Sequence, residues 1–177
     1  MYPSSIKQNR QSRVDVSPEL ASFFAGTQFR VFREITLGAG ASMVLKLDRT
    51  CDIIIRGFDL DVSAGELKAE IFSGATTGGS FSEAVTIFPK NLSSSLPTPV
   101  YKTQAVMTTG GTISGGTLID VLRVKTSNAT GQVASIGGKI EDQYGAPAGT
   151  GYYKISNPGN SDATAIFKMW WEELPTV

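Results

Sequence analysis

The chain has 177 residues, of which 41% are hydrophobic and 18% charged, and its 16 basic and 16 acidic residues cancel. This composition supports a folded core and excludes a disordered polar chain, and zero net charge gives no field that attracts nucleic acid. Histidine is absent and cysteine occurs once, which removes the commonest general base and every multi-cysteine metal site. We therefore expect no metal, no cofactor and no nucleic-acid partner.

Residues 1–26 are predicted to form an N-terminal docking arm, followed by one β-sandwich domain over residues 27–177. The arm is polar at its start and then carries a short helix signal, in which Ser17 can cap and Pro18 suits the first helical position. Apolar residues then recur on one helical face and need a surface to cover them. The candidate docking residues are Lys7, Arg10, Arg13, Leu20, Phe23 and Phe24.

From residue 27 onward, short runs of alternating apolar and polar residues predict strands, and Gly, Pro and Ser separate them. The runs that alternate or are rich in β-formers are residues 28–35, 43–48, 52–62, 67–72, 85–88, 101–109, 117–126, 152–156 and 163–174. Residues 73–84 are expected to be a loop, and residues 127–149 a long irregular connection. Cys51 begins an apolar run and is expected to be a small core residue.

Eight or nine short strands, with no amphipathic helix after the arm, are typical of an antiparallel sandwich or barrel. A β-rich domain of about 150 residues suits a jelly roll better than an immunoglobulin sandwich of about 100. The predicted fold class is therefore all-β, a jelly-roll-like antiparallel β-sandwich with an extended N-terminal arm.

The last two strands contain the most informative aromatic residues. In residues 163–174, alternation places one wholly apolar set, including Trp171, toward the core. If residues 152–156 pair with this strand as a hairpin, the outer face carries the predicted subunit interface: Tyr152, Ile166, Lys168 and Trp170. Contiguous outward apolar residues favour a subunit contact. A sugar-stacking platform and an ordinary surface are the alternatives.

Catalysis has no clear place in this sequence, and we expect no catalytic residues. The serines occur in loops, and none lies in a G-x-S-x-G elbow. Asp59 and Asp61 share one strand face about 7 Å apart, a spacing that glycosidase carboxylates use. Alternation places ordinary solvated acids at the same spacing, so the protein is predicted not to be an enzyme.

Five segments together resemble small β-rich structural proteins of tailed-bacteriophage virions. They are VFREITLGAGASMVLKL (31–47), IIIRGFDLDVSAGELKAEIFSGATTGGSF (53–81), PTPVY (97–101), GGTISGGTLIDVLRVKTSNAT (110–130) and PAGTGYYKISNPGNSDATAIFKMWWEE (147–173). Proteins of this kind are capsid decoration (cement) proteins, head fibres, or small tail and collar components. The resemblance covers residues 28–173 and carries over no catalytic residue.

The resemblance implies a virion protein that forms a homo-oligomer, with a trimer as the expected state. Its arm would dock onto the major capsid protein or another virion protein. The initial residues lack the apolar segment of a secretory signal, and no run reaches the roughly 20 apolar residues of a membrane helix. We therefore expect assembly in the host bacterial cytoplasm without a membrane partner. A carbohydrate- or receptor-binding module of a phage tail or fibre is the alternative function.

Overall fold

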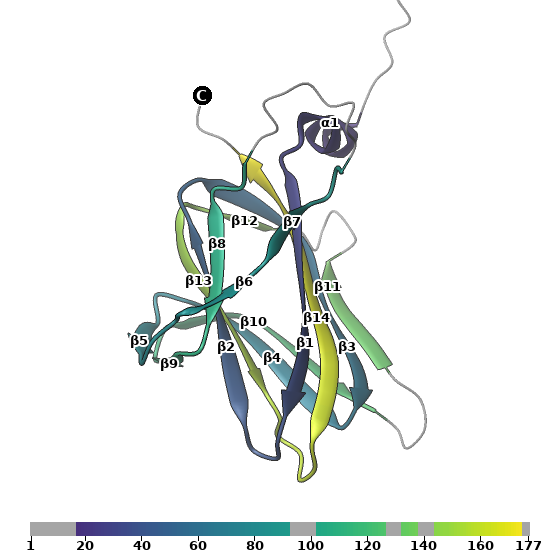
Figure 1. Ribbon diagram of the computed structural model, residues 1–177, viewed down its shortest axis with the longest axis vertical. Coiled ribbons are helices and arrows are strands. Elements are labelled where there is room, and N and C mark those ends of the chain that lie inside the picture. Colours follow the sequence, from purple (N-terminus) through teal and green to yellow (C-terminus); the bar gives the residue numbers. More distant parts are fainter. Residues whose placement is uncertain (1–16, 93–101, 127–131, 138–143, 175–177) are drawn as a thin grey trace, which may run out of the picture.

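The computed structural model describes residues 17–92, 102–126, 132–137 and 144–174. These residues fold into two packed antiparallel sheets, with one helix, α1 (Pro18–Ala25), at one end of the sandwich (Figure 1). The first sheet contains β1 (Gln28–Leu37), β3 (Asp52–Ala64), β7 (Ile87–Pro89), β11 (Gln132–Gly137), β12 (Tyr144–Ala146) and β14 (Ala163–Leu174). The second contains β2 (Ser42–Arg49), β4 (Glu66–Ser73), β6 (Glu83–Val85), β8 (Ala105–Thr109), β10 (Thr117–Lys125) and β13 (Gly149–Ser156). A separate pair is formed by β5 (Thr76–Gly78) and β9 (Thr112–Ser114).

The strand order is that of a jelly roll. The eight strands concerned, in chain order, are β1, β2, β3, β4, β10, β11, β13 and β14. The first pairs with the eighth, the second with the seventh, the third with the sixth and the fourth with the fifth. The chain therefore resembles one long hairpin, which is rolled up when the eighth strand also pairs with the third and the seventh with the fourth. This arrangement confirms the predicted fold class.

The core lies between the two sheets and follows the predicted alternation. In β14, Ala165, Phe167, Met169 and Trp171 all face inward and are buried. The rings of Phe58, Tyr153 and Phe167 meet in the middle of the sandwich with centroids 6.0–6.4 Å apart. Cys51 is 3% exposed and belongs to this core, as expected. Full burial of each such large side chain contributes roughly 1.5–3 kcal/mol, so this cluster contributes several kcal/mol to stability.

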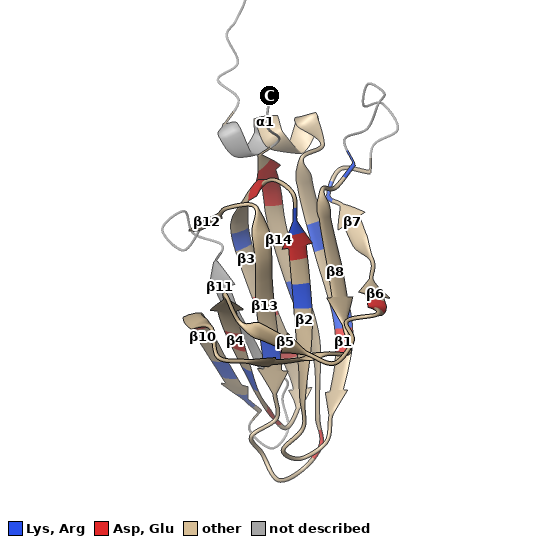
Figure 2. Cartoon of the chain, turned by 90° about the vertical axis from the view of Figure 1, so that its left-hand side faces the viewer, with Lys and Arg blue, Asp and Glu red and all other residues tan. Residues whose placement is uncertain are grey.

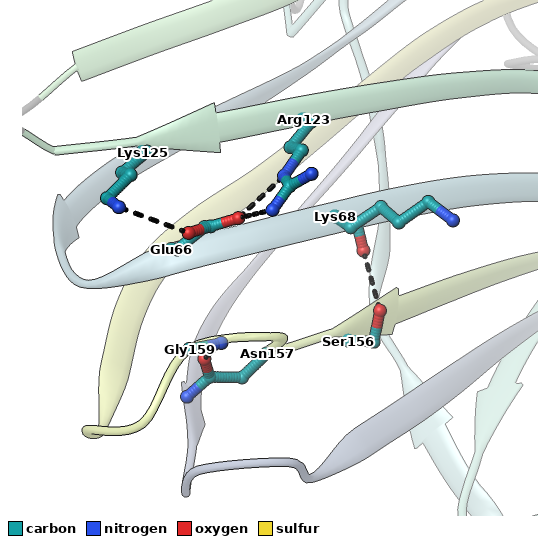
Figure 3. A network of polar contacts seen from close by, with 7 residues as sticks. All are labelled: Glu66, Lys68, Arg123, Lys125, Ser156, Asn157 and Gly159. Atoms are coloured by element: carbon teal, nitrogen blue, oxygen red, sulfur yellow. Dashed lines mark hydrogen bonds and ion pairs between the residues drawn. The ribbon is translucent and has the colours of Figure 1, made fainter.

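The predicted hairpin between the last two strands is wrong. The β13 strand pairs with β2 and β4, whereas β14 pairs with β1 and β3 in the opposite sheet. The turn between them crosses from one sheet to the other and is held by Asn157, which is 1% exposed. Its amide Nδ2 donates to the carbonyl oxygens of Leu37 (2.9 Å) and Ser161 (2.8 Å), and its Oδ1 accepts from the Gly159 amide. Figure 3 shows this turn beside the ion pairs of Glu66.

Three further expectations differ from the structure. The connection over residues 127–149 contains β11 and β12, which pair with β3; β11 was missed because its small residues interrupt the apolar alternation. The single strand expected at residues 85–88 is two strands: β6 belongs to the second sheet and β7 to the first. The loop expected at residues 73–84 contains the short strand β5 and the start of β6.

Candidate interaction surface

The two sheets differ in what covers their outer faces. On the second sheet, the Phe81 ring lies 6.4 Å from the Tyr152 ring, and the Lys46 ammonium lies 5.9 Å from the Phe81 ring centroid. The segment that holds Phe81 follows β5, which crosses in front of this sheet in Figure 2. As a result Tyr152 is only 6% exposed, although it points away from the core. This outward aromatic residue is covered by its own chain.

The Phe81 ring packs directly against a glycine. A Cβ atom added at Gly111 would collide with the Phe81 ring. The glycine in the loop between β8 and β9 therefore permits the ring to approach the backbone. The cover over Tyr152 is thus built from two loops that the sequence separates by 30 residues.

The first sheet presents an outer face that no other described segment covers, and we call it the open face. It consists of the outward residues of β1, β14 and β3, with the edge strand β7 beside β1. These residues are Arg30, Phe32, Glu34, Asp59, Asp61, Ile166, Lys168 and Trp170, together with Phe88 and Lys90 at the edge. Strand register aligns them in rows across the sheet: Arg30 beside Trp170, Phe32 beside Lys168, and Glu34 beside Ile166.

One end of the open face is aromatic and hollowed. Phe32 is 51% exposed, and its ring stacks on Phe88 with centroids 5.5 Å apart and planes 12° apart. A hollow of about 330 Å³ lies beside them; its lining includes Arg30, Phe32, Lys90, Lys168 and Trp170. An exposed aromatic cluster around a hollow, rimmed by cations, is the kind of surface that anchors a partner.

The charges of the open face are sorted along the strands. Arg30 and Lys90 lie at the aromatic end, and no ion pair joins either to another described residue. Glu34 and Asp61 lie two rows away, beside Ile166. In the row between, the Lys168 ammonium lies 3.5 Å from the Asp61 carboxylate, a weak contact between half-exposed side chains. Beyond Trp170, Arg56 and Glu172 neutralise each other in an ion pair. The remaining charges make the face cationic at one end and acidic at the other.

The structure brings three of the four predicted interface residues together. Ile166, Lys168 and Trp170 are neighbours on the outward side of β14 and are each partly exposed. Tyr152 lies on the outer face of the opposite sheet, so the prediction of one shared surface is wrong for this residue. Arg30, Phe32, Phe88 and Lys90 also belong to this surface and were not predicted. Alternation in residues 28–35 is compatible with Arg30 and Phe32 facing outward, but only the pairing of β1 with β14 shows that they adjoin Trp170.

The described part of the predicted arm is held against the sandwich. Helix α1 spans the predicted position and ends at Ala25; Gly26 follows it with a φ of 75°, which suits glycine. Gln28 Nε2 donates to Ser22 Oγ (2.7 Å), and Asn91 Nδ2 donates to the Phe23 carbonyl (3.1 Å). Phe24 remains 55% exposed, and Phe23 meets it edge to face. Leu20 lies within the helix; Lys7, Arg10 and Arg13 fall outside the described residues.

The described residues contain no group of three or more His, Cys, Asp or Glu side chains placed to hold a metal ion. No helix among them has the length and apolarity to cross a membrane. A second hollow, of about 300 Å³, opens between the sheets and is lined by residues that include Arg49, Ile119 and Tyr144. Burial, with a smaller effect of Asp120, raises the pKa of Tyr144 to about 12, so its phenol is neutral at physiological pH.

Comparisons with known proteins give no family assignment. No family model matches the chain, and no curated protein matches it. Solved structures with some similarity include T=1 particles derived from infectious bursal virus (15% identity, TM-score 0.20) and the VP2 subviral particle of infectious bursal disease virus (16% identity, TM-score 0.19). Each alignment covers 84% of this chain, but only 40% and 42% of the other chain. The assignment of the jelly roll rests on the strand order and not on these similarities.

Proposed function

We propose that the protein is a non-enzymatic structural component of a virion, which assembles with copies of itself through the open face. A decoration (cement) protein on the capsid of a tailed bacteriophage is the specific role that the sequence resemblance favours. Jelly rolls occur in viral capsid proteins, but also in lectins and cupins, so the fold alone does not decide the function. The observation that carries the proposal is the exposed Phe32, stacked on Phe88 beside Trp170.

The contrast between the two sheets supports this assignment. The chain covers its outward Tyr152 with Phe81 but leaves Phe32 half exposed. Exposed aromatic clusters are uncommon on proteins that work as monomers and frequent at subunit contacts. Because Arg30 and Lys168 flank the cluster, the proposed contact has the aromatic core and charged rim of a protein interface.

Light scattering on the full chain over a range of concentrations tests self-association. We expect a mass that is a multiple of the monomer mass, and Phe32→Ser should shift it toward the monomer. Val106→Ser is the matched control, because Val106 is 58% exposed and lies on β8 of the second sheet. A wild-type mass equal to one chain at all concentrations would contradict the proposal. The same measurement distinguishes the trimer that the resemblance implies from other multiples of the monomer mass.

Docking through the N-terminal segment is the second part of the proposal. Because Ser22 and Phe23 bond to the sandwich, the appropriate truncation removes residues 1–16 and keeps α1. We expect this truncated protein to fold and to associate with itself, yet to be missing from purified particles. Full incorporation into particles would contradict docking by these residues. A Phe24→Ser variant would then test the contribution of α1, because Phe24 is 55% exposed on this helix.

A carbohydrate- or receptor-binding module is the second candidate. The hollow beside Trp170, of about 330 Å³, favours it because an aromatic wall with cations at the rim can hold a sugar ring that carries an acid group. Glycan-array binding that Trp170→Ala abolishes, with the oligomer unchanged, would select this function over self-association.

A further inference from the structure

We infer that the open face is a two-fold docking surface, on which a second copy of the chain binds face to face with its strands reversed. The inference rests on the proposed function, since it specifies how copies associate through the open face. A two-fold contact of one face closes as a dimer and so departs from the trimer that the resemblance implies. Its basis is that the charges and apolar residues of the open face complement those of the same face turned by 180°.

The strand β1 carries the complementary pattern in its simplest form. Arg30, Phe32 and Glu34 are successive outward residues of this strand, and all three are exposed. Arg30 and Glu34 are separated by four residues, about 13 Å at the rise of a β-strand, with Phe32 midway. A two-fold axis that passes beside Phe32, across the strands, brings Arg30 of one copy over Glu34 of the other. The same rotation brings the two Phe32 rings together at the axis.

The neighbouring strand β14 matches under the same rotation. Trp170 lies beside Arg30 and Ile166 lies beside Glu34, so the axis that exchanges the charges also exchanges these two apolar residues. Trp170 of one copy then meets Ile166 of the other, and the hollow beside Trp170 can receive the smaller side chain. Apolar residues meet apolar residues and cations meet acids, which is the self-complementarity that an isologous interface requires.

The middle row does not oppose this arrangement. Lys168 falls near the axis and would approach Lys168 of the second copy. Asp59 lies beside Lys168 in this row, and the Asp61 carboxylate lies 3.5 Å from the Lys168 ammonium, so two acids of its own chain offset its charge. Outer faces of sheets also pack with a relative rotation of about 30°, which displaces residues near the axis from direct opposition.

A parallel arrangement of the two copies is disfavoured by the same residues. An axis along the strands would bring the Arg30–Lys90 end of one copy against the same end of the other. The acidic ends, with Glu34 and Asp61, would also meet. Like charges facing each other across an interface suppress an association, so the sorted charges select the reversed orientation.

Two charge reversals test the inference. Arg30→Glu and Glu34→Arg each place like charges at both ends of the two-fold contact. Each variant alone should associate at least about tenfold more weakly than the wild type, because like-charge pairs across an interface are strongly unfavourable. In a mixture of the two, one end of the heterodimer keeps the native pair and the other end holds the same pair reversed. The mixture should therefore associate with a dissociation constant within about threefold of the wild type.

The measurement is sedimentation velocity on each full-length variant and on the equimolar mixture, with native mass spectrometry of one isotope-labelled partner to distinguish heterodimers from homodimers. Circular dichroism confirms that each variant is folded. Lys102→Glu, at an exposed position just before β8 of the second sheet, is the control and should leave association unchanged. If the wild type associates but neither reversal weakens it, or if mixing does not restore association, the two-fold contact is overturned while self-association stands. A wild type that stays monomeric overturns both.

Discussion

Tyr152 and Trp170 both point away from the core, yet they lie on the outer faces of opposite sheets. Tyr152 is 6% exposed because Phe81 covers it, whereas Trp170 lines an open hollow. The two aromatic residues therefore act at different levels of structure. Tyr152 contributes to the stability of the single chain, and Trp170 belongs to the surface through which we propose that copies associate.

Phe81→Ala and Phe32→Ala should separate these two levels. Removal of Phe81 exposes Tyr152 and should lower the free energy of unfolding by about 1–3 kcal/mol. Removal of the half-exposed Phe32 should change it by less than about 0.5 kcal/mol at concentrations where the chain is monomeric. Urea denaturation followed by fluorescence measures both values. Equal losses from the two variants would show that Phe32 is also part of the monomer's packing.

Gly111 provides an independent test of the cover over Tyr152. Because a side chain at this position collides with the Phe81 ring, Gly111→Val should displace the ring and destabilise the chain by an amount similar to Phe81→Ala. In the double variant the two effects should not add, since the collision needs both side chains. Full additivity in urea denaturation would mean that Gly111 acts through its backbone instead.

The sequence was sufficient for the fold class because the core depends on alternation alone. The inward residues of β14, from Ala165 to Trp171, were identified without knowledge of any partner strand. Pairing was not predictable in the same way. Alternation gives the side of a strand on which a residue lies, but not the sheet to which the strand belongs. The error over Tyr152 follows from this limit, because a turn as short as residues 157–162 can join two sheets as well as two strands of one hairpin.

The open face was only partly predictable for the same reason. Its β14 residues, Ile166, Lys168 and Trp170, were found from local alternation. Arg30 and Phe32 come from a strand more than 130 residues earlier in the chain, and only the register of β1 with β14 places them beside Trp170. The jelly roll pairs its first strand with its last, so such surfaces unite the most distant parts of the sequence.

Asn157 is expected to be a principal polar contributor to stability. Its amide group joins the turn after β1 to the turn before β14, and Asn157→Ala leaves the carbonyls of Leu37 and Ser161 without this donor. The expected loss is about 2–4 kcal/mol, since buried groups lose their partners. Asn160→Ala, at an exposed position in the same turn, should cost less than about 0.5 kcal/mol. Similar midpoints of urea unfolding for the two variants would contradict this stabilising role of Asn157.

Glu173 should be the most sensitive carboxylate of the sandwich. It is 1% exposed, and its oxygens accept hydrogen bonds from the Gln104 backbone amide (2.8 Å), the Trp171 indole (3.2 Å) and the Thr103 hydroxyl. Glu173→Ala removes the acceptor of all three buried or half-buried donors and should cost about 3 kcal/mol or more. Glu173→Gln keeps the shape of the side chain, and its free energy of unfolding should lie between that of Glu173→Ala and that of the wild type. Glu83→Gln, at a carboxylate that is 61% exposed, should be close to neutral.

Tyr144 should make stability depend on pH only in the alkaline range. Burial raises its pKa to about 12 in the folded chain, whereas an unfolded tyrosine ionises near pH 10. Below about pH 10 both states hold the proton, so stability is unaffected; between about pH 10 and 12 only the unfolded chain releases it, and stability falls. The Tyr144 hydroxyl has no hydrogen-bond partner among the described residues, so Tyr144→Phe should not destabilise the chain at pH 7. Urea midpoints from pH 8 to 11.5 should decline less steeply for Tyr144→Phe than for the wild type, and parallel declines would assign the alkaline loss to other groups.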